Sequence, residues 1–234
     1  YIREFTRTNN AGTNWNPGSI SFTNSANYSI SNFFAFSYDT AYACMFPVTG
    51  TGGAIVKTND GGATWTVQPG ATYVNSWADF VHFFDRNNGV CVGDPTATTG
   101  TDFFIYTTSN GGASWTQVPG TSIPDCQTGE TGIVNYYDAV GHTIWFTTST
   151  GRVYKSTDMG ATWTVVTVNA ALTTASTVKF KDANVGIIVG QTSPFPMYKT
   201  IDGGATWQSL APTGFLVKTP QLANVPGTTS TWID

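Results

Sequence analysis

The sequence predicts an all-β fold, a β-propeller of four-stranded antiparallel blades, and two repeated patterns lead to that prediction. The first is a polar turn that ends in tryptophan and returns along the whole chain. The second is an apolar run that ends in aspartate and is followed by another apolar run. Self-similarity at a period of about 40–50 residues is typical of propellers and solenoids, and four short strands in each period indicate propeller blades.

The tryptophan-ended turn occurs five times, as TNNAGTNW, TNDGGATW, TSNGGASW, STDMGATW and TIDGGATW, and the first copy is the most degenerate. Its tryptophans lie 50, 50, 48 and 44 residues apart. Each copy pairs an acidic or amide residue with the tryptophan, and these framework residues are Asn10, Trp15, Asp60, Trp65, Asn110, Trp115, Asp158, Trp163, Asp202 and Trp207.

The chemistry of the turn is structural. Asp60 is expected to accept backbone N–H groups two residues further on and so to close the turn with its own side chain. The two following glycines supply positive φ at little steric cost. Thr58 and Thr64 add hydroxyl contacts, and Trp65 is expected to pack its ring against the sheet. We therefore place the turn between the third and fourth strands of each blade and assign it no catalytic role.

Strands account for the rest of each period. The runs FSYD, HFFD, NYYD and KFKD end at Asp39, Asp85, Asp138 and Asp182. A short turn and a second apolar run follow each, so these acids are expected between the first and second strands. In the clearest blade the strands are expected at 80–85, 90–93, 103–109 and 115–118.

The period divides one propeller domain, 1–234, into a partial blade at 1–20, blades at 21–70, 71–120, 121–168 and 169–212, and a partial blade at 213–234. Two arrangements fit this division. The partial blades could complete each other and close a five-bladed ring, or the chain could be a segment of a larger propeller. The abrupt start, without methionine, favours a processed or partial piece of a longer product.

Composition narrows the function. Only 10% of the residues are charged, against about 25% in ordinary soluble domains. The net charge of −4 supplies no basic stripe, which excludes nucleic acid as a partner. No run of about 18 apolar residues occurs, so no membrane span is predicted. An uncharged polar surface with 14% aromatic residues favours a secreted or cell-surface protein.

The cysteines and histidines predict no metal centre. Cys44 and Cys91 lie in apolar runs and are expected to be buried, while a bridge between Cys91 and Cys126 is left open. No pair of His or Cys residues has the spacing of a zinc site. We predict no cofactor, with a structural cation such as calcium as the one exception that the loops could accommodate.

Acids that the turns do not use gather in loops predicted at the opposite rim of the blades. The candidate ligand-binding residues are Asp79, Asp94, Asp102, Asp125 and Glu130, with Trp77 beside them. They would suit a cation, or a carbohydrate that stacks on Trp77 or Tyr73, and a pair of carboxylates is also what a glycosidase needs. The structural alternative is that Asp94 and Glu130 cap loop amides and tie loops together. No residue is assigned as catalytic. The basic residues on or before the third strands are expected along solvated blade flanks: Arg7, Arg152, Lys57, Lys155 and Lys199.

The turns resemble the Asp-box (BNR) repeat of sialidase-like propellers, S/T-x-D-x-G-x-T/S-W. Sialidases grip a carboxylated sugar with three arginines, the first in an F/Y-R-I-P motif. The arginines here are Arg3, Arg7, Arg86 and Arg152, and no RIP sequence occurs. Sialidase activity is therefore not expected, and enzyme activity in general is not favoured.

Longer segments, among them VHFFDRNNGVCVGDP, FIYTTSNGGASW and IWFTTSTGRVYKSTDMGATW, resemble exported Bacteroidetes propellers. Those are related to the photosystem II assembly-factor propellers and are often secreted by the type IX system. They are usually seven-bladed, which favours the larger propeller. Low charge, a rigid repeat scaffold and long loops on one rim favour a non-catalytic exported or cell-surface module that binds an extracellular protein or glycan. The alternatives are a glycoside hydrolase-like enzyme on extracellular polysaccharide, as in Asp-box xyloglucanases, and an accessory factor of a secretion machinery or surface assembly.

Overall fold

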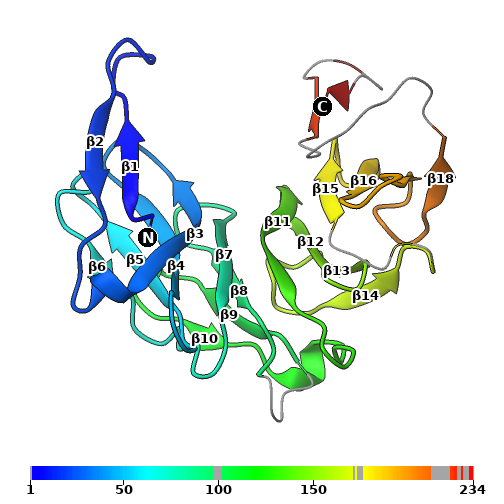
Figure 1. Ribbon diagram of the computed structural model, residues 1–234, viewed down its shortest axis with the longest axis horizontal. Coiled ribbons are helices and arrows are strands. Elements are labelled where there is room, and N and C mark those ends of the chain that lie inside the picture. The colour runs from blue at the N-terminus through cyan, green and yellow to red at the C-terminus, as the bar shows by residue number, and fades with distance from the viewer. Residues whose placement is uncertain are drawn as a thin grey trace. The chain divides into compact units, whose positions relative to one another are not determined.

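The computed structural model describes residues 2–96, 102–170, 172, 176–211, 222–225, 228 and 232–233. The chain divides into two compact units, residues 1–119 and residues 120–234. Strands make up nearly all of its regular structure (Figure 1), and the only helices among the described residues are two 3₁₀ turns of three residues each.

The first unit contains one two-stranded and two four-stranded antiparallel sheets. Each strand pairs with the next one along the chain. The two-stranded sheet is β1 (Glu4–Arg7) and β2 (Asn16–Ser19), and the 3₁₀ turn η1 (Ser25–Asn27) follows it. The next sheet is β3 (Tyr28–Ala35), β4 (Ala41–Pro47), β5 (Ala54–Thr58) and β6 (Thr66–Val67). The third is β7 (Ala78–Phe83), β8 (Gly89–Gly93), β9 (Phe104–Thr108) and β10 (Thr116–Gln117).

The second unit has two four-stranded sheets and one two-stranded sheet with the same meandering order. It begins with η2 (Gly120–Ser122). Its first sheet is β11 (Gly132–Val140), β12 (Thr143–Thr148), β13 (Arg152–Ser156) and β14 (Thr164–Thr167). The next is β15 (Ser176–Phe180), β16 (Gly186–Gly190), β17 (Met197–Thr200) and β18 (Gln208–Leu210), and the last is β19 (Ala223–Asn224) and β20 (Trp232–Ile233).

These sheets confirm the predicted all-β architecture of four-stranded antiparallel blades. In the blade used to set the expectation, the first strand spans 78–83, two residues earlier than predicted. Asp85 instead belongs to the turn, where its carboxylate accepts the amides of Asn87 and Asn88 at 2.7 and 2.8 Å. An aspartate that bonds its own following amides favours a turn over a strand end.

The prediction that Asp138 marks a turn is wrong. Asp138 lies inside β11 and pairs with Trp145 across the sheet. The turn comes three residues later, at Gly141 and His142. The Asp138 carboxylate accepts the Phe180 amide of β15 at 2.6 Å, so its hydrogen bond goes to the neighbouring sheet and the strand continues.

The core of each unit lies between neighbouring sheets that pack face to face. In the first unit, Tyr42 and Cys44 of β4 pack with Phe83 of β7 and Cys91 of β8. In the second unit, Trp145 packs with Phe180 and other buried residues of the β15–β18 sheet. Alternation along each strand sends every second side chain into such a layer.

The tryptophans of the turns occupy the same layers. Trp65, Trp115 and Trp163 are each about 5–6% exposed. Trp65 packs edge-on against Phe5 of the preceding sheet. Trp15 is 59% exposed, because no described sheet precedes the one to which it belongs.

The cysteines are all free. Cys44 and Cys91 have no exposed surface, as expected for small buried side chains, and burial raises the pKa of Cys91 to about 12. The bridge between Cys91 and Cys126 that the sequence left open is not formed.

Candidate functional site

The five tryptophan-ended turns, here called the box turns (8–15, 58–65, 108–115, 156–163 and 200–207), share one hydrogen-bond pattern. In the second, the Asp60 carboxylate accepts the Thr64 amide at 2.9 Å and the hydroxyls of Thr64 and Thr58 at 2.6 and 2.8 Å. The Thr58 hydroxyl accepts the Gly62 amide at 2.7 Å. The amide that closes the turn is thus four residues beyond Asp60, not two as the sequence argument expects. Gly61 and Gly62, both at positive φ, let the chain turn back within these four residues. The corresponding amides of the other copies are Asn14 to Asn10 (2.9 Å), Ser114 to Asn110 (3.0 Å), Thr162 to Asp158 (2.9 Å) and Thr206 to Asp202 (2.9 Å).

This bonding predicts a loss of stability in acid. The hydroxyl and amide of Thr64 and the hydroxyl of Thr58 lower the pKa of Asp60 to about 2. An unfolded aspartate has a pKa of about 4, so the contribution of Asp60 is complete above pH 4 and is lost as the pH falls toward 2. We expect Asp60→Asn to flatten the pH dependence of the melting temperature between these values, because Asn110 makes the same main-chain bond in its own turn. Melting curves at pH 2–5 test this, with the exposed Asp125→Asn as the control; an unchanged slope in Asp60→Asn contradicts it.

Box turns also join each sheet internally. Their first glycine, or its equivalent, donates its N–H to the turn between the first and second strands of the same sheet. These bonds run from Gly61 to Asp39 (2.8 Å), Gly111 to Asn87 (2.9 Å), Met159 to His142 (3.1 Å) and Gly203 to Asn184 (2.8 Å). Both kinds of turn therefore lie at the same edge of each sheet.

The carbonyl of that glycine accepts a hydrogen bond from a side chain of the preceding sheet. The pairs are Arg7 with Gly61, Tyr42 with Gly111 (2.7 Å) and Trp145 with Gly203 (2.9 Å). These inter-sheet bonds hold neighbouring sheets of one unit together. The polar groups at the box-turn edge thus serve to hold the sheets together, and this edge is structural.

At the opposite edge of the first unit, Trp77 and Asp94 lie in loops near Asp79. The prediction that Asp79 lies in a loop is wrong, because Asp79 is the second residue of β7. The Asp94 amide donates to the Trp77 carbonyl at 2.9 Å, and the Ser76 hydroxyl donates to the Asp94 carbonyl. Trp77 is 43% exposed and stacks on Phe46 at the end of β4, with ring centroids 6.0 Å apart and planes inclined by 22°. We call Trp77 and Phe46 the aromatic platform.

Asp79 lies beneath this loop and is almost inaccessible, at 3% exposure. Its Oδ2 makes no hydrogen bond among the described residues. Burial raises the pKa of its carboxyl well above the usual range, and the negative charge of Asp94 raises it further. Two of the predicted binding residues, Asp79 and Asp94, are thus close enough for the charge of one to raise the pKa of the other. Asp102 is half-buried just before β9, and residues 97–101, which connect it to the Asp94 loop, lie outside the described part of the chain.

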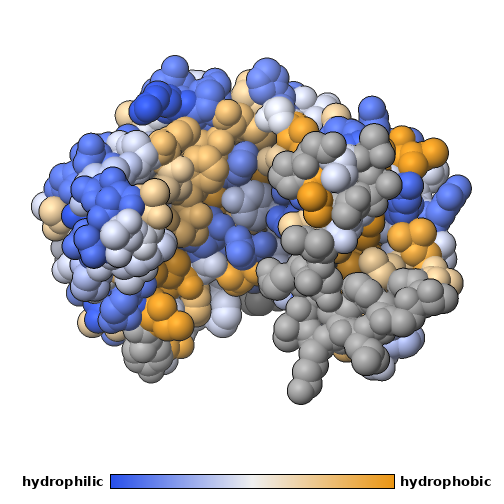
Figure 2. Space-filling view, turned by 90° about the horizontal axis from the view of Figure 1, so that it is seen from above, coloured by the Kyte–Doolittle hydropathy of each residue, from blue (hydrophilic) through white to orange (hydrophobic). Residues whose placement is uncertain are grey.

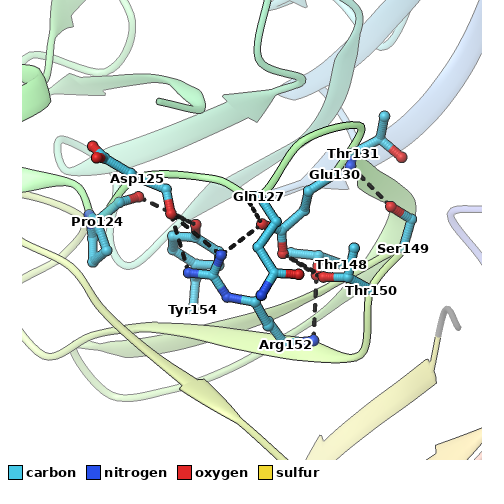
Figure 3. Close-up of polar contacts among 10 residues, drawn as sticks. All are labelled: Pro124, Asp125, Gln127, Glu130, Thr131, Thr148, Ser149, Thr150, Arg152 and Tyr154. Atoms are coloured by element: carbon cyan, nitrogen blue, oxygen red, sulfur yellow. Dashed lines mark hydrogen bonds and ion pairs between the residues drawn. The ribbon is translucent and has the colours of Figure 1, made fainter. Parts of the chain in front are cut away.

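In the second unit, Glu130 is the centre of a buried polar knot (Figure 3). Its carboxylate pairs with the Arg152 guanidinium at 2.8 Å and accepts the hydroxyls of Thr148 and Thr150 at 2.5 and 2.8 Å. The main-chain N–H of Gln127 also donates to this carboxylate, at 2.7 Å. With Glu130 at 3% exposure, this carboxylate ties its loop to β12 and β13. Its contacts match the structural alternative, in which Glu130 caps loop amides and joins loops.

Asp125 contributes its main chain to the same knot. Its carbonyl accepts two bonds from the Arg152 guanidinium, both at 3.2 Å, and one from the Tyr154 hydroxyl at 3.3 Å. Its carboxylate is exposed and points away from the knot (Figure 3). Asp125 and Glu130 are therefore neighbours in the chain and in space, but only the main chain of Asp125 joins the knot.

Placing Arg152 on a solvated flank was wrong, since it is 7% exposed. The sequence did hold a signal for this. Arg7, Lys57, Lys155 and Lys199 each lie three residues before the acid or amide of a box turn, whereas Arg152 lies six residues before Asp158. Successive strand residues face opposite sides, so an even offset puts Arg152 on the face opposite to the lysines. The sequence argument also missed Phe46, whose ring stacks on that of Trp77, because nothing in its apolar run distinguishes it from its neighbours.

A hollow of about 340 Å³ lies in the first unit between the β1–β2 sheet and the β3–β6 sheet. Phe5, Phe33 and Trp65 line it with mutual ring-centroid distances of 5.7–5.8 Å. The β1–β2 sheet on one side of the hollow has two strands, whereas the β3–β6 sheet on the other side has four. The hollow is thus a place where the core layer is only partly covered.

Comparison with known proteins identifies a family. The family model described as photosynthesis system II assembly factor YCF48 matches residues 47–178, more than half of the chain. No curated protein matches. Among the described residues, no helix is long and apolar enough to cross a membrane.

Solved structures of low identity share the fold. YCF48 from Cyanidioschyzon merolae has a TM-score of 0.53 and 18% identity, over 87% of this chain and 65% of that one. An ancestral GH74 enzyme has a TM-score of 0.63 and 16% identity, over 93% of this chain and 29% of that one. A structure of YCF48 bound to D1 peptide matches at a TM-score of 0.41 and 14% identity, over 89% and 76%. The chain thus spans less than two thirds of the C. merolae protein and of the enzyme. The folds agree as β-propellers, and with the family match over 47–178 the chain belongs to the YCF48-type family of BNR β-propellers.

Proposed function

We propose that this chain is a non-catalytic propeller, exported or displayed at the cell surface, that binds a protein partner through the aromatic platform. The observation that carries the proposal is the exposed Trp77 stacked on Phe46 at the edge that the box turns do not use. Tryptophan is enriched among the residues that supply most of the energy of protein interfaces. Loops on a rigid scaffold are also the usual place for binding residues.

Family membership supports a protein as the partner. The family is named for an assembly factor, and its member YCF48 has been solved bound to D1 peptide. The surface of the first unit agrees with this choice. Large apolar side chains at least 36% exposed are more frequent among its described residues than among those of the second unit. Apolar areas are visible on the molecular surface in Figure 2.

Export and a role beside a secretion machinery or surface assembly are part of the same proposal. They are supported by the resemblance to exported Bacteroidetes propellers of the type IX system and by the low content of charged residues, 10%. A glycan is the alternative ligand, because Trp77 beside Asp94 also suits a sugar ring and its hydroxyls. A hydrolase receives no support from the acids of the first unit, because Asp79 is buried beneath its loop. The likeness to GH74 enzymes is one of fold.

The platform predicts which substitution abolishes binding. Labelled protein is applied to an array of linear peptides and to a glycan array, and each hit is titrated in solution. We expect peptide binding that Trp77→Ala weakens by at least about tenfold, as for a central interface tryptophan. Trp15→Ala, which removes another exposed tryptophan at a box turn, is the matched control and should leave the affinity unchanged. Binding to glycans alone, with the same dependence on Trp77, favours the alternative ligand. Binding that is indifferent to Trp77 contradicts the platform.

A further inference from the structure

The first unit buries the carboxylate of Asp79, which forms no ion pair among the described residues. Asp79 is the extra residue of a β-bulge in β7, since Ala78 pairs with Gly93 and Phe80 pairs with Val92. A bulge redirects a side chain away from the regular alternation of the strand. The redirected carboxylate is 3% exposed, and its Oδ2 has no hydrogen-bond partner among the described residues.

The buried carboxylate of Glu130 in the second unit shows which partners Asp79 lacks among the described residues. Glu130 has an arginine and three further hydrogen-bond donors. A buried carboxylate is tolerable when it is paired and bonded in this way, and costly when it is not. The charged group that acts on Asp79 is the carboxylate of Asp94, which has the same sign. A buried acid beside a second acid is neutralised either by a proton or by a cation.

We propose that Asp79 and Asp94 bind a hard divalent cation of the calcium class. The two carboxylates would be its charged ligands, with water and main-chain oxygens of the described residues around them completing the coordination. Calcium accepts six to eight oxygen ligands and combines carboxylates with backbone carbonyls and water. The inference does not depend on the proposed binding function.

The available donors argue against a softer metal. Among the described residues, no group of three or more His, Cys, Asp or Glu side chains is arranged to hold a metal ion, so an ion here would depend on water and main-chain oxygens for most of its coordination. The nearby thiol is Cys44, whose pKa burial raises well above its usual value, so it stays protonated and is a poor ligand. Transition metals favour thiolate and imidazole ligands, whereas oxygen ligands select calcium or magnesium. Magnesium demands near-ideal octahedral geometry, which makes calcium the better match to an irregular loop.

The position of the site predicts what the ion would do. Asp79 is the second residue of β7, an edge strand of its sheet, and Asp94 directly follows β8 and donates its amide to the Trp77 carbonyl. An ion held by both acids would fasten the loop that carries Trp77 to the bulge beneath it. It would therefore stabilise the first unit and order the aromatic platform.

The test measures calcium binding and stability together in the full chain. Melting temperatures are recorded in EDTA, in calcium and in magnesium at matched ionic strength, and binding is titrated by calorimetry. At a calcium concentration 100 times Kd, the unfolding equilibrium constant should fall about 100-fold. The shift should be lost in Asp79→Asn and in the more accessible Asp94→Asn, and kept in Asp125→Asn, a control that removes an exposed acid in the other unit.

Terbium supplies a second readout that does not depend on folding stability. Excitation of tryptophan should sensitise the emission of bound Tb³⁺, calcium should compete for it, and Trp77→Phe should reduce the emission while leaving the calcium shift in melting temperature intact. The proposal is overturned if wild-type protein shows neither a calcium shift nor sensitised emission. It is also overturned if Asp79→Asn melts higher than wild type at neutral pH whether calcium is present or not, which would mean that a proton shared by the two acids replaces the cation.

Discussion

Replacing Arg152 with alanine is expected to destabilise the second unit by about 3–5 kcal/mol, which is the usual cost of removing one partner from a buried ion pair. The carboxylate of Glu130 has no exposed surface, and its ion pair with Arg152 is 2.8 Å long. Without the guanidinium, Glu130 would keep a buried negative charge, and the Asp125 carbonyl would lose two of its hydrogen bonds. Urea unfolding followed by circular dichroism measures the loss.

The pair Lys181–Asp182 is the control for Arg152. Its atoms are 3.6 Å apart and both side chains are partly exposed, so Lys181→Ala should change the free energy of unfolding by about 0–1 kcal/mol. The double variant Arg152→Met with Glu130→Gln removes both charges and should recover part of the loss, because no unpaired ion remains. Equal effects of Arg152→Ala and Lys181→Ala would contradict the inference that burial makes the Glu130–Arg152 pair costly to break.

The second large effect is expected at Trp145, where substitution with alanine should cost about 3–5 kcal/mol. Trp145 has no exposed surface and stacks on Phe180 with ring centroids 3.7 Å apart and planes inclined by 10°. Its Nε1 donates to the Gly203 carbonyl at 2.9 Å. Alanine would leave a cavity between the two sheets and would also leave a buried carbonyl without its donor.

Two variants separate these contributions. Trp145→Phe keeps an aromatic ring over Phe180 but removes the indole N–H, and should cost about 1–3 kcal/mol, the penalty of an unsatisfied buried polar group. Trp15→Ala removes an exposed tryptophan and should change stability by less than about 0.5 kcal/mol. Chemical unfolding followed by circular dichroism is suited to the whole series, because tryptophan fluorescence changes with the substitutions themselves. A cost for Trp145→Ala no larger than that of Trp15→Ala would contradict the packing argument.

The strands and turns were predictable from the sequence because the same residue pattern recurs in every repeat. The Thr58 and Asp60 pattern of one box turn returns with similar bond lengths in the other four, so errors in one copy are corrected by the next. Asp138 shows the limit of this reasoning. It matches the strand-ending pattern by position, but its carboxylate bonds to the Phe180 amide of another sheet, and no local pattern encodes a partner 42 residues away.

The candidate site was harder to predict for the same reason. Loop acids could be counted in the sequence, but whether each becomes a buried, bonded group depends on its partners. Glu130 meets Arg152, which strand periodicity could have turned inward. Asp79 becomes buried because a bulge shifts its register, and a bulge leaves no clear mark in the residues around it. Asp125 remains at the surface although it is only five residues from Glu130.

The bonds between each box turn and the preceding sheet give the box-turn edge a polarity. In each pair the donor belongs to the earlier sheet and the acceptor is a glycine carbonyl of the later one, and a guanidinium, a phenol and an indole all serve as donors. Because the acceptor is main chain, the donor can be exchanged without redesigning the turn. Trimming a unit from its amino-terminal side would strip the next turn of its donor, whereas trimming it from the other side would leave the remaining turns satisfied. Unravelling within a unit should therefore spread more readily toward the carboxyl terminus than toward the amino terminus.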